Sequence, residues 1–312
     1  MLTTGVATFA VACGTTSVRG RDADASTPPV AVTLATASSP TRLVLDNAYA
    51  YFTTCTPSGG GVSRVLLAGG PVTSVAQGPN CPVDLAFDGG ELYVAGLNGN
   101  DVARLDSIRP TILVVAKDAL NGIVVDATSV YMTTATSILV APRQGGTATT
   151  LATVTGQRAA TRPIADADHV YWADPLLGTL NGVAKSDGTV TTLSAALDGV
   201  TALALFDSDV YVAAGYVIAK VPTAGGASTT LGTAAGAQSL AIAVDARGVY
   251  FSSTGVLWSL PTTGGALTTV ATDHGDLDAI ALAKDAVYWT SAPPCDASDA
   301  SDCQGRIASI AR

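Results

Sequence analysis

Few residues in this sequence are of the types that carry metal or acid–base chemistry. It has two histidines, His169 and His274, and Glu91 is the single glutamate among 25 acidic residues. A catalytic zinc site needs three protein ligands, drawn mostly from His, Cys and acidic residues. Two separated histidines therefore predict no metal cluster. A glycosidase pair made of aspartates stays open, but no spacing marks two particular aspartates as partners.

One set of polar residues recurs nine to eleven positions before a tyrosine that repeats along the chain. If the repeats form a ring, these positions meet at the mouth of its central channel. Two Arg and two Asp there could grip a small polar ligand, or they could pair with each other and plug the axis. The residues at these positions are Arg42, Asp84, Asn121, Arg162, Thr201, Ser239 and Asp278.

A second candidate is the acidic segment "PPCDASDASDC" at 293–303. Its Asp296, Asp299 and Asp302 offer the oxygen ligands that Ca²⁺ prefers, but their every-third spacing does not match the alternating ligands of an EF-hand. We therefore predict a solvated acidic loop for partner contact and no cofactor, with calcium as the alternative.

The five cysteines bear on where the protein resides. If Cys13 is lipidated, Cys55, Cys81, Cys295 and Cys303 remain, and an even number in an exported chain indicates two disulfides. Of three possible pairings we favour Cys55 with Cys81 and Cys295 with Cys303, all placed in turns of one rim. The alternative is reduced thiols in a cytosolic protein.

The N-terminus has the character of a targeting segment. Residues 1–13, "MLTTGVATFAVAC", form a short apolar run whose last four residues resemble a bacterial lipobox, with Ala10 where that motif usually has Leu. The polar residues 14–28 would then form a tether to a domain at 29–312. The alternative is a disordered N-terminus with an incidental cysteine.

Composition favours an all-β protein with an acidic surface. Asp, which suits turns, accounts for 24 of the 25 acidic residues, while Glu, which suits helices, is nearly absent. The net charge of −9 argues against binding to nucleic acid or directly to an anionic membrane. No other run reaches the roughly 18 consecutive apolar residues of a membrane span.

A repeated unit organises the chain. Its tyrosine landmarks are spaced by 42, 38, 40, 40, 39 and 38 residues, close to one four-stranded propeller blade. In the clearest copy, four strand-length segments are expected at 239–245, 249–253, 255–261 and 266–272. The landmarks predict a seven-bladed β-propeller and are Tyr51, Tyr93, Tyr131, Tyr171, Tyr211, Tyr250 and Tyr288.

The two ends of the chain predict how the ring closes. The seventh copy stops at Ala311, where the turn to its fourth strand should begin, while "VAVTLATAS" at 30–38 matches a fourth strand that has no blade of its own. This N-terminal strand should complete blade seven and remove an exposed sheet edge.

Turn residues separate structural from functional positions. Pro-x-x-Gly-Gly follows the third strand in three copies, and recurrent aspartates such as Asp126 end the first strand, where Asx turns explain them without a ligand. The distance from tyrosine to the proline position is 11 residues in three blades but 15 in blade one and 23 in blade seven. These neighbouring insertions predict a recognition surface on one rim.

"HVYWADPLLGTLNGVAKSDG" at 169–188 and "AVYWTSA" at 286–292 resemble the YWTD repeats of low-density-lipoprotein-receptor propellers. That family has six blades, and most copies here lack the motif. Residues 29–312 more broadly resemble secreted bacterial β-propellers of uncharacterised function. The blade count is also similar to propeller lactonases and streptogramin lyases, for which the resemblance implies Glu or paired His at the central funnel. Of these types, only His274 lies on the matching face.

These observations favour an exported, lipid-anchored binding scaffold, in the periplasm, on the outer membrane or secreted. We expect a monomer that holds a protein or carbohydrate ligand on its elaborated rim. The alternative is a propeller hydrolase or lyase at the channel mouth that uses His274 with Asp276 or Asp278.

Overall fold

The alternation of apolar strands with Gly- and Asp-containing turns folds into seven four-stranded antiparallel sheets in the computed structural model. The structure describes residues 29–106, 110–154, 161–234, 241–273, 275–292 and 304–312. Blades one to three consist of β2 (Pro40–Leu45), β3 (Tyr49–Thr56), β4 (Gly59–Leu66) and β5 (Thr73–Gly78); β6 (Asp84–Asp88), β7 (Glu91–Ala95), β8 (Asp101–Leu105) and β9 (Pro110–Val115); β10 (Leu120–Val125), β11 (Ser129–Thr134), β12 (Ser137–Pro142) and β13 (Thr149–Thr153).

Blades four to seven continue the same order around the ring. They consist of β14 (Ile164–Ala165), β15 (His169–Asp174), β16 (Thr179–Ala184) and β17 (Val190–Ser194); β18 (Val200–Phe206), β19 (Asp209–Ala214), β20 (Val217–Pro222) and β21 (Thr229–Thr233); β22 (Ile242–Asp245), β23 (Gly248–Ser253), β24 (Val256–Leu260) and β25 (Thr268–Thr272); β26 (Asp276–Leu282), β27 (Ala286–Ala292), β28 (Gln304–Ala311) and β1 (Val32–Ser38).

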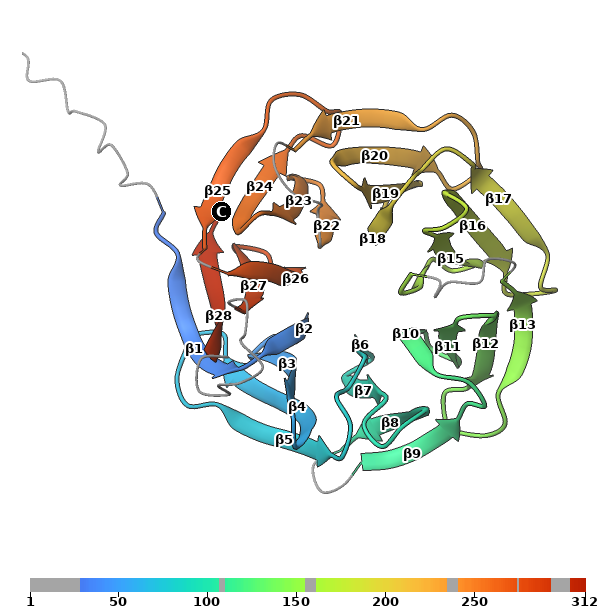
Figure 1. Ribbon diagram of the computed structural model, residues 1–312, viewed down its shortest axis with the longest axis horizontal. Helices are drawn as coiled ribbons and strands as arrows, with labels where there is room; N and C mark the ends of the chain where they lie inside the picture. The colour runs from blue at the N-terminus through green and yellow to red at the C-terminus, as the bar shows by residue number, and fades with distance from the viewer. Residues whose placement is uncertain (1–28, 107–109, 155–160, 235–240, 274, 293–303) are drawn as a thin grey trace, which may run out of the picture.

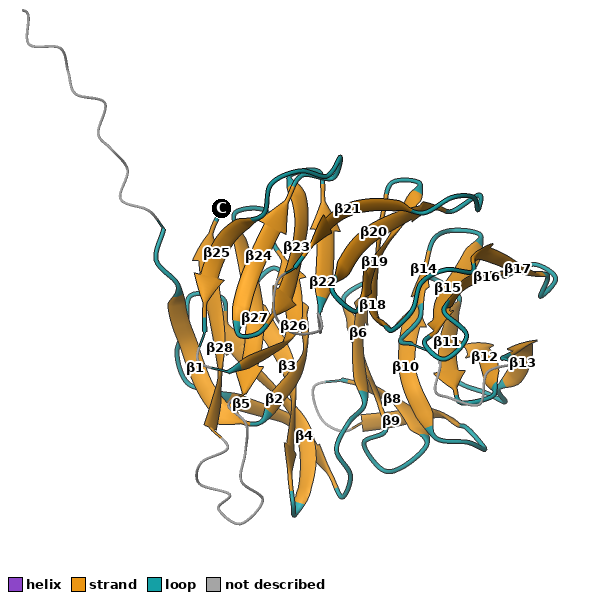
Figure 2. Ribbon diagram, turned by 45° about the horizontal axis from the view of Figure 1, so that its top comes forward, coloured by secondary structure: helices purple, strands orange, loops and turns teal. Residues whose placement is uncertain are grey.

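The sheets stand radially around a central axis, with the first strand of each blade innermost (Figure 1). Strands and loops account for all the described residues (Figure 2). Within those residues, no helix has the length and apolar character needed to span a membrane. The seven-bladed, four-stranded, all-β prediction is confirmed.

Blade seven is closed by both ends of the chain, as predicted. Strand β1 pairs antiparallel with β28, with Val32 opposite Ser309 and Ser38 opposite Gln304. Leu34 is only 7% exposed and joins a core that includes Phe52 of blade one. The N-terminal strand therefore completes one blade and also contributes to the contact with the next.

The hydrophobic core lies between the blades. Seven clusters of buried apolar residues each join two adjacent blades, and each blade interface has one. The landmark tyrosines are all buried in these clusters, and so are Trp172 and Trp289. Burial on both faces of every blade explains why the strands carry apolar residues on both sides.

Two rims can be told apart by their connections. We call the rim with the turns between first and second strands and between third and fourth strands the Asp rim, and the opposite one the loop rim. On the Asp rim, Asp126 Oδ1 accepts hydrogen bonds from the backbone N–H groups of Thr128 and Ser129, 2.9 Å from each nitrogen. Asp46 and Asp166 make the equivalent bonds, which confirms the Asx-turn interpretation.

The glycine pair of the turn between third and fourth strands also joins blades. Gly145 and Gly146 have φ of 99° and 145°, values that favour glycine. Gly145 N–H closes the turn on the Pro142 carbonyl, while Gly146 N–H donates to Leu113 in the preceding blade at 3.0 Å. Blade one has the same turn at Leu66, Gly69 and Gly70, a fourth copy with Leu in place of Pro.

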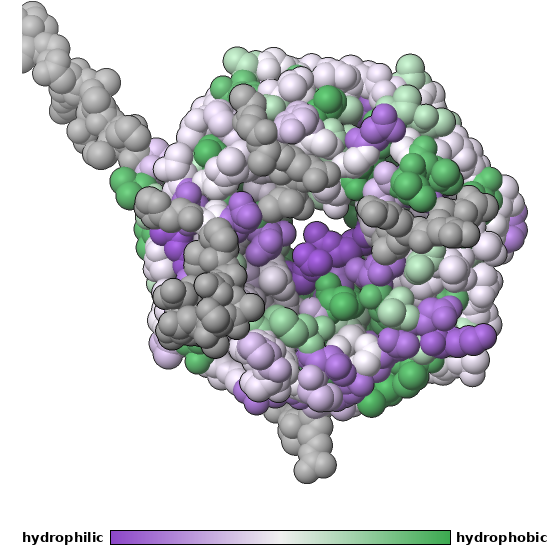
Figure 3. Space-filling model, viewed as in Figure 1, coloured by the Kyte–Doolittle hydropathy of each residue, from purple (hydrophilic) through white to green (hydrophobic). Residues whose placement is uncertain are grey.

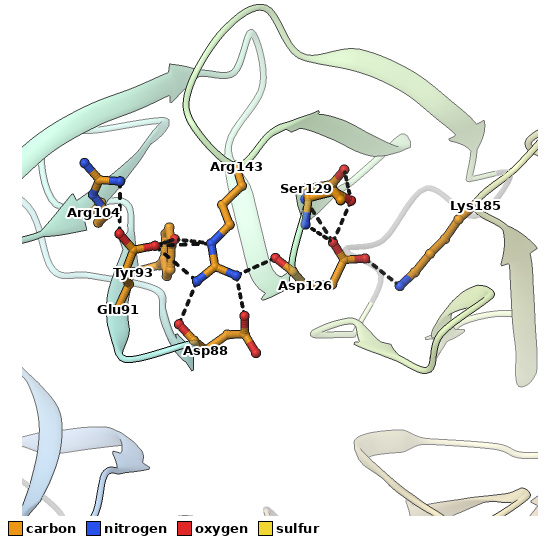
Figure 4. A network of polar contacts seen from close by, with 9 residues as sticks. Asp88, Glu91, Tyr93, Arg104, Asp126, Ser129, Arg143 and Lys185 are labelled. Carbon is orange, nitrogen blue, oxygen red and sulfur yellow. Dashed lines mark hydrogen bonds and ion pairs between the residues drawn. The ribbon is translucent and has the colours of Figure 1, made fainter.

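A group of contacts centred on one cation, Arg143, joins blade three to blade two on the Asp rim (Figure 4). We call this arrangement the cation latch. The guanidinium of Arg143 donates to the Tyr93 hydroxyl at 2.7 Å and to the Glu91 carboxylate at 3.1 and 3.2 Å, and it forms an ion pair with Asp88. It also donates to the backbone carbonyls of Asp88 and Asp126, both at 2.7 Å. Glu91 is thereby held in a structural contact away from the channel.

The same latch recurs at two other interfaces. Lys185 reaches Asp126 at 2.8 Å, with its Nζ 4.9 Å from the centre of the Tyr131 ring. Arg312 pairs with Asp245, with its guanidinium 5.3 Å from the Tyr250 ring centre. In each case a cation one residue beyond the third strand contacts the aspartate and tyrosine of the preceding blade.

A disulfide joins Cys55 and Cys81, which are separated by 26 positions. This confirms one predicted pairing. Cys55 lies within β3 and not in a turn as expected, because the longer insertion of blade one extends the β3–β4 hairpin. The other pair, Cys295 and Cys303, lies outside the described residues, as does Cys13.

Candidate functional site

The candidate site is the channel mouth on the loop rim, where the innermost strands begin. The predicted ring positions come together there from different blades: Arg42 lies in β2, Asp84 begins β6, Asn121 lies in β10, Arg162 precedes β14, Thr201 lies in β18 and Asp278 lies in β26. Ser239, the remaining ring position, lies outside the described residues.

The charged members interact across blades. Arg162 of blade four forms an ion pair with the buried Asp84 of blade two, with 3.4 Å between Nη1 and Oδ1. The second oxygen of Asp84 accepts the Ile123 N–H at 3.0 Å. Arg42 of blade one donates from Nε to the Val83 carbonyl at 2.8 Å. These contacts fix one carboxylate and orient both guanidinium groups.

Of the two aspartates in the ring, Asp278 is the one less neutralised by neighbouring cations. Burial raises the pKa of its carboxyl to about 6, and neighbouring Asp276 acts in the same direction, while Arg42 and Arg162 act against it. Burial also lowers the pKa of the Arg42 guanidinium, and the positive charge of Arg162 adds to this effect. A carboxyl that titrates near neutral pH can accept or release a proton at the channel mouth.

The axis is open in the space-filling view. Figure 3 shows an opening through the centre of the ring, bordered in part by hydrophilic surface. Beneath the mouth, a cavity of about 220 Å³ is lined by Asp84, Arg162 and Thr201 together with apolar residues such as Leu43 and Ile242. The charged side chains of the ring are therefore paired with each other only in part, and they leave space around the axis.

Two features of the mouth had only weak signals in the sequence. Gly122 lets Arg162 lie against β10, since a Cβ at this glycine would stand 2.6 Å from the Arg162 Cγ. The buried Nδ2 of Asn121 has no hydrogen-bond partner among the described residues. An isolated Gly inside a strand is a signal of close approach, but it does not identify the approaching residue.

The other predicted site residues are not all placed. His274, Asp296, Asp299 and Asp302 lie outside the described residues, so their predicted roles stay predictions. His169 begins β15 on the Asp rim, far from the channel mouth in its blade. Over the described ranges, no group of three or more His, Cys, Asp or Glu side chains is placed to hold a metal ion.

Comparison with known proteins places the fold and no more. No protein-family model matches this sequence, and no curated protein is recognisably similar to it. The YWTD likeness therefore stays a resemblance.

Solved structures share this fold at low sequence identity. Virginiamycin B lyase from Staphylococcus aureus superposes with a TM-score of 0.72 at 12% identity, covering 91% of this chain and 99% of the lyase. The WD40 propeller domain of Doa1 has a TM-score of 0.71 at 12% identity, covering 89% and 96%. PorZ, a surface component of the type-IX secretion system of Porphyromonas gingivalis, has a TM-score of 0.61 at 14% identity, covering 83% of this chain and 36% of PorZ.

Proposed function

We propose that this protein is an extracytoplasmic binding scaffold, anchored through Cys13, that holds a polar ligand at the channel mouth on its loop rim. The observation that carries the proposal is the ring of Arg42, Asp84, Arg162 and Asp278 around an open axis. Ring closure keeps these side chains in place, so the site is formed before a ligand arrives.

The chemistry of the mouth suits a ligand with both donors and acceptors. Guanidinium groups offer N–H donors only, carboxylates offer acceptors, and the amide of Asn121 offers both. Hydroxyl groups of a carbohydrate, or the polar loop of a protein partner, match such a mixed set. The segment containing Asp296, Asp299 and Asp302 would add contacts from blade seven.

Export is supported by two independent features. The Cys55–Cys81 disulfide is typical of oxidising compartments, and the lipobox-like residues precede a polar tether. We expect the protein in the membrane fraction of the producing cell and its release by a Cys13→Ala change. Recovery of both forms in the soluble cytosolic fraction would contradict the localisation.

Partner capture from envelope extract, together with binding to an array of neutral glycans, tests the ligand site. Asp278→Asn and Arg42→Gln should each weaken retention at least about tenfold, equivalent to about 1.4 kcal/mol. Lys220→Gln is the matched control, since Lys220 pairs with Asp209 on the opposite rim. Equal retention by all variants would place the ligand elsewhere. The triple change of Asp296, Asp299 and Asp302 to Ala would then test the acidic segment at 293–303.

A hydrolase or lyase is the second candidate, favoured by the pKa of about 6 at Asp278. Such a carboxyl can act as a general acid or base near neutral pH, with Asp276 beside it. An aryl lactone is a suitable probe, because its ring opening is measured directly by absorbance. Turnover that follows a pKa near 6 and disappears in Asp278→Asn would establish this activity, and no turnover by the wild type would reject lactone hydrolysis.

A further inference from the structure

A crevice between blades three and four opens on the loop rim, away from the axis. It has a volume of about 430 Å³. Its walls come from the end of β13 and from β15, β16 and β17, and include Trp172, Asp174, Leu177, Asn181 and Val190.

Asp174 lines this crevice with an unmatched carboxylate oxygen. The residue is 2% exposed. Its Oδ1 accepts hydrogen bonds from the backbone N–H groups of Leu176 and Leu177 at 2.9 and 3.0 Å. Its Oδ2 is buried and has no hydrogen-bond partner among the described residues. A buried carboxylate oxygen without a partner is costly, and such groups often mark a missing ligand.

Blade seven shows how the equivalent place is completed within the chain. Ser291 pairs with Arg306 across β27 and β28, as Asp174 pairs with Thr179 across β15 and β16. Asp273 directly follows β25, as Val154 directly follows β13.

In blade seven the carboxylate has an internal cation. Asp273 Oδ2 lies 2.7 Å from the Arg306 guanidinium and also accepts hydrogen bonds from Trp289 Nε1 at 2.8 Å and Ser291 Oγ at 3.0 Å. The cavity left beside it measures about 210 Å³. Blade four also has a tryptophan and a carboxylate here, Trp172 and Asp174. It has Thr179 where blade seven has Arg306.

We propose that the crevice of blade four binds a guanidinium group, with Asp174 as its counter-ion. The bound cation would occupy the position that Arg306 fills in blade seven. Leu177 and Val190, which are 51% and 45% exposed, offer apolar walls for the aliphatic stem of such a ligand.

Polar groups at the crevice are already matched to each other. Asn181 Nδ2 donates to the Thr179 hydroxyl at 3.0 Å, and its Oδ1 accepts the Thr192 hydroxyl at 2.9 Å. The charge of Asp174 is therefore the group left to select the ligand. The site is separate from the channel mouth, so its test does not depend on whether the proposed function is correct.

Calorimetric titration with three small probes tests the site. Agmatine represents a free guanidinium compound, N-acetyl-arginine amide represents an arginine side chain of a protein partner, and N-acetyl-citrulline amide is its uncharged counterpart. We expect saturable binding of at least one guanidinium probe and at least tenfold weaker binding of the citrulline probe. Tighter binding of agmatine indicates a free compound, and tighter binding of the capped arginine indicates a protein partner.

Two variants locate the binding site. Asp174→Asn keeps the turn acceptor and removes the charge, and should reduce affinity at least tenfold. Thr179→Arg introduces the internal cation of blade seven, and should abolish binding while raising the melting temperature. Asp187→Asn, an exposed aspartate of the same blade, is the control and should bind as the wild type does.

Several results would overturn the proposal. These are no saturable binding of either guanidinium probe, equal binding of the citrulline probe, or unchanged binding by Thr179→Arg. The last variant remains informative if Asp174→Asn fails to fold.

Discussion

Replacing Arg143 by alanine should destabilise the ring more than any change at an exposed cation. Its side chain is 8% exposed and contacts Asp88, Glu91 and Tyr93 of the preceding blade. Removing one partner of a buried ion pair costs about 3–5 kcal/mol. The carboxylates of Asp88 and Glu91 are 42% and 35% exposed, so water can solvate them in the variant. We therefore expect a loss of about 2–4 kcal/mol in the free energy of unfolding.

Urea unfolding followed by tryptophan fluorescence measures this loss, after reversibility has been checked. In a thermal scan the same loss corresponds to a fall of about 3–7 °C in the melting temperature. Arg143→Lys keeps the charge but not the planar fork, and should give an intermediate value.

The matched control is Arg104→Ala. Arg104 pairs with the same Glu91 at 3.1 Å but is 25% exposed, and such a pair contributes about 0–1 kcal/mol. Hydrogen bonding from Tyr93 lowers the pKa of Glu91, so its stabilising contribution is present above about pH 4.3 and is lost as the pH falls. The loss in the free energy of unfolding caused by Arg143→Ala should therefore become smaller as the pH falls. Equal losses for Arg143→Ala and Arg104→Ala would refute the latch as a source of stability.

Three further changes test other parts of the structure. Replacing Cys55 and Cys81 together by serine should cost about 3 kcal/mol, as expected for a loop of 26 residues, and unchanged urea unfolding would contradict this. Deleting residues 29–39 should lower the melting temperature and cause aggregation measurable by light scattering, because β28 becomes an exposed edge; a monodisperse variant of wild-type stability would refute the closure. Burial raises the pKa of Asp278 to about 6, so the native state binds the proton more tightly and this residue's contribution to stability falls as the pH rises from about 4 to 6. Asp278→Asn should remove that slope, and identical pH profiles would show that the carboxyl titrates normally.

The repeat made the architecture predictable, because its features are local. Spacing of the buried tyrosines such as Tyr93 gave the blade number, and the unmatched strand at 30–38 gave the closure. The offset from each tyrosine also placed Arg42, Asp84 and Asp278 at one end of the inner strands, since equivalent positions in a ring lie at equal depth.

Contacts between blades could not be predicted in the same way. Arg143 and Glu91 are 52 positions apart, and nothing local to either residue identifies the other. A signal was present in retrospect, because Arg143, Lys185 and Arg312 all stand one residue beyond their third strands. Asp174 likewise reads as an ordinary turn residue, and only the three-dimensional arrangement shows that one of its oxygens lacks a partner.

The pairing of β1 with β28 has a consequence for how the protein folds during synthesis. Blades one to six each consist of consecutive strands, so they can form from short-range contacts as the chain emerges. Blade seven needs Val32 to meet Ser309, which lies 277 positions later in the chain. Bringing these two strands together costs loop-closure entropy. The blade interfaces that have already formed offset this cost. Completion of the ring must therefore wait until β28 has been synthesised, so the ring stays open while blades one to six form.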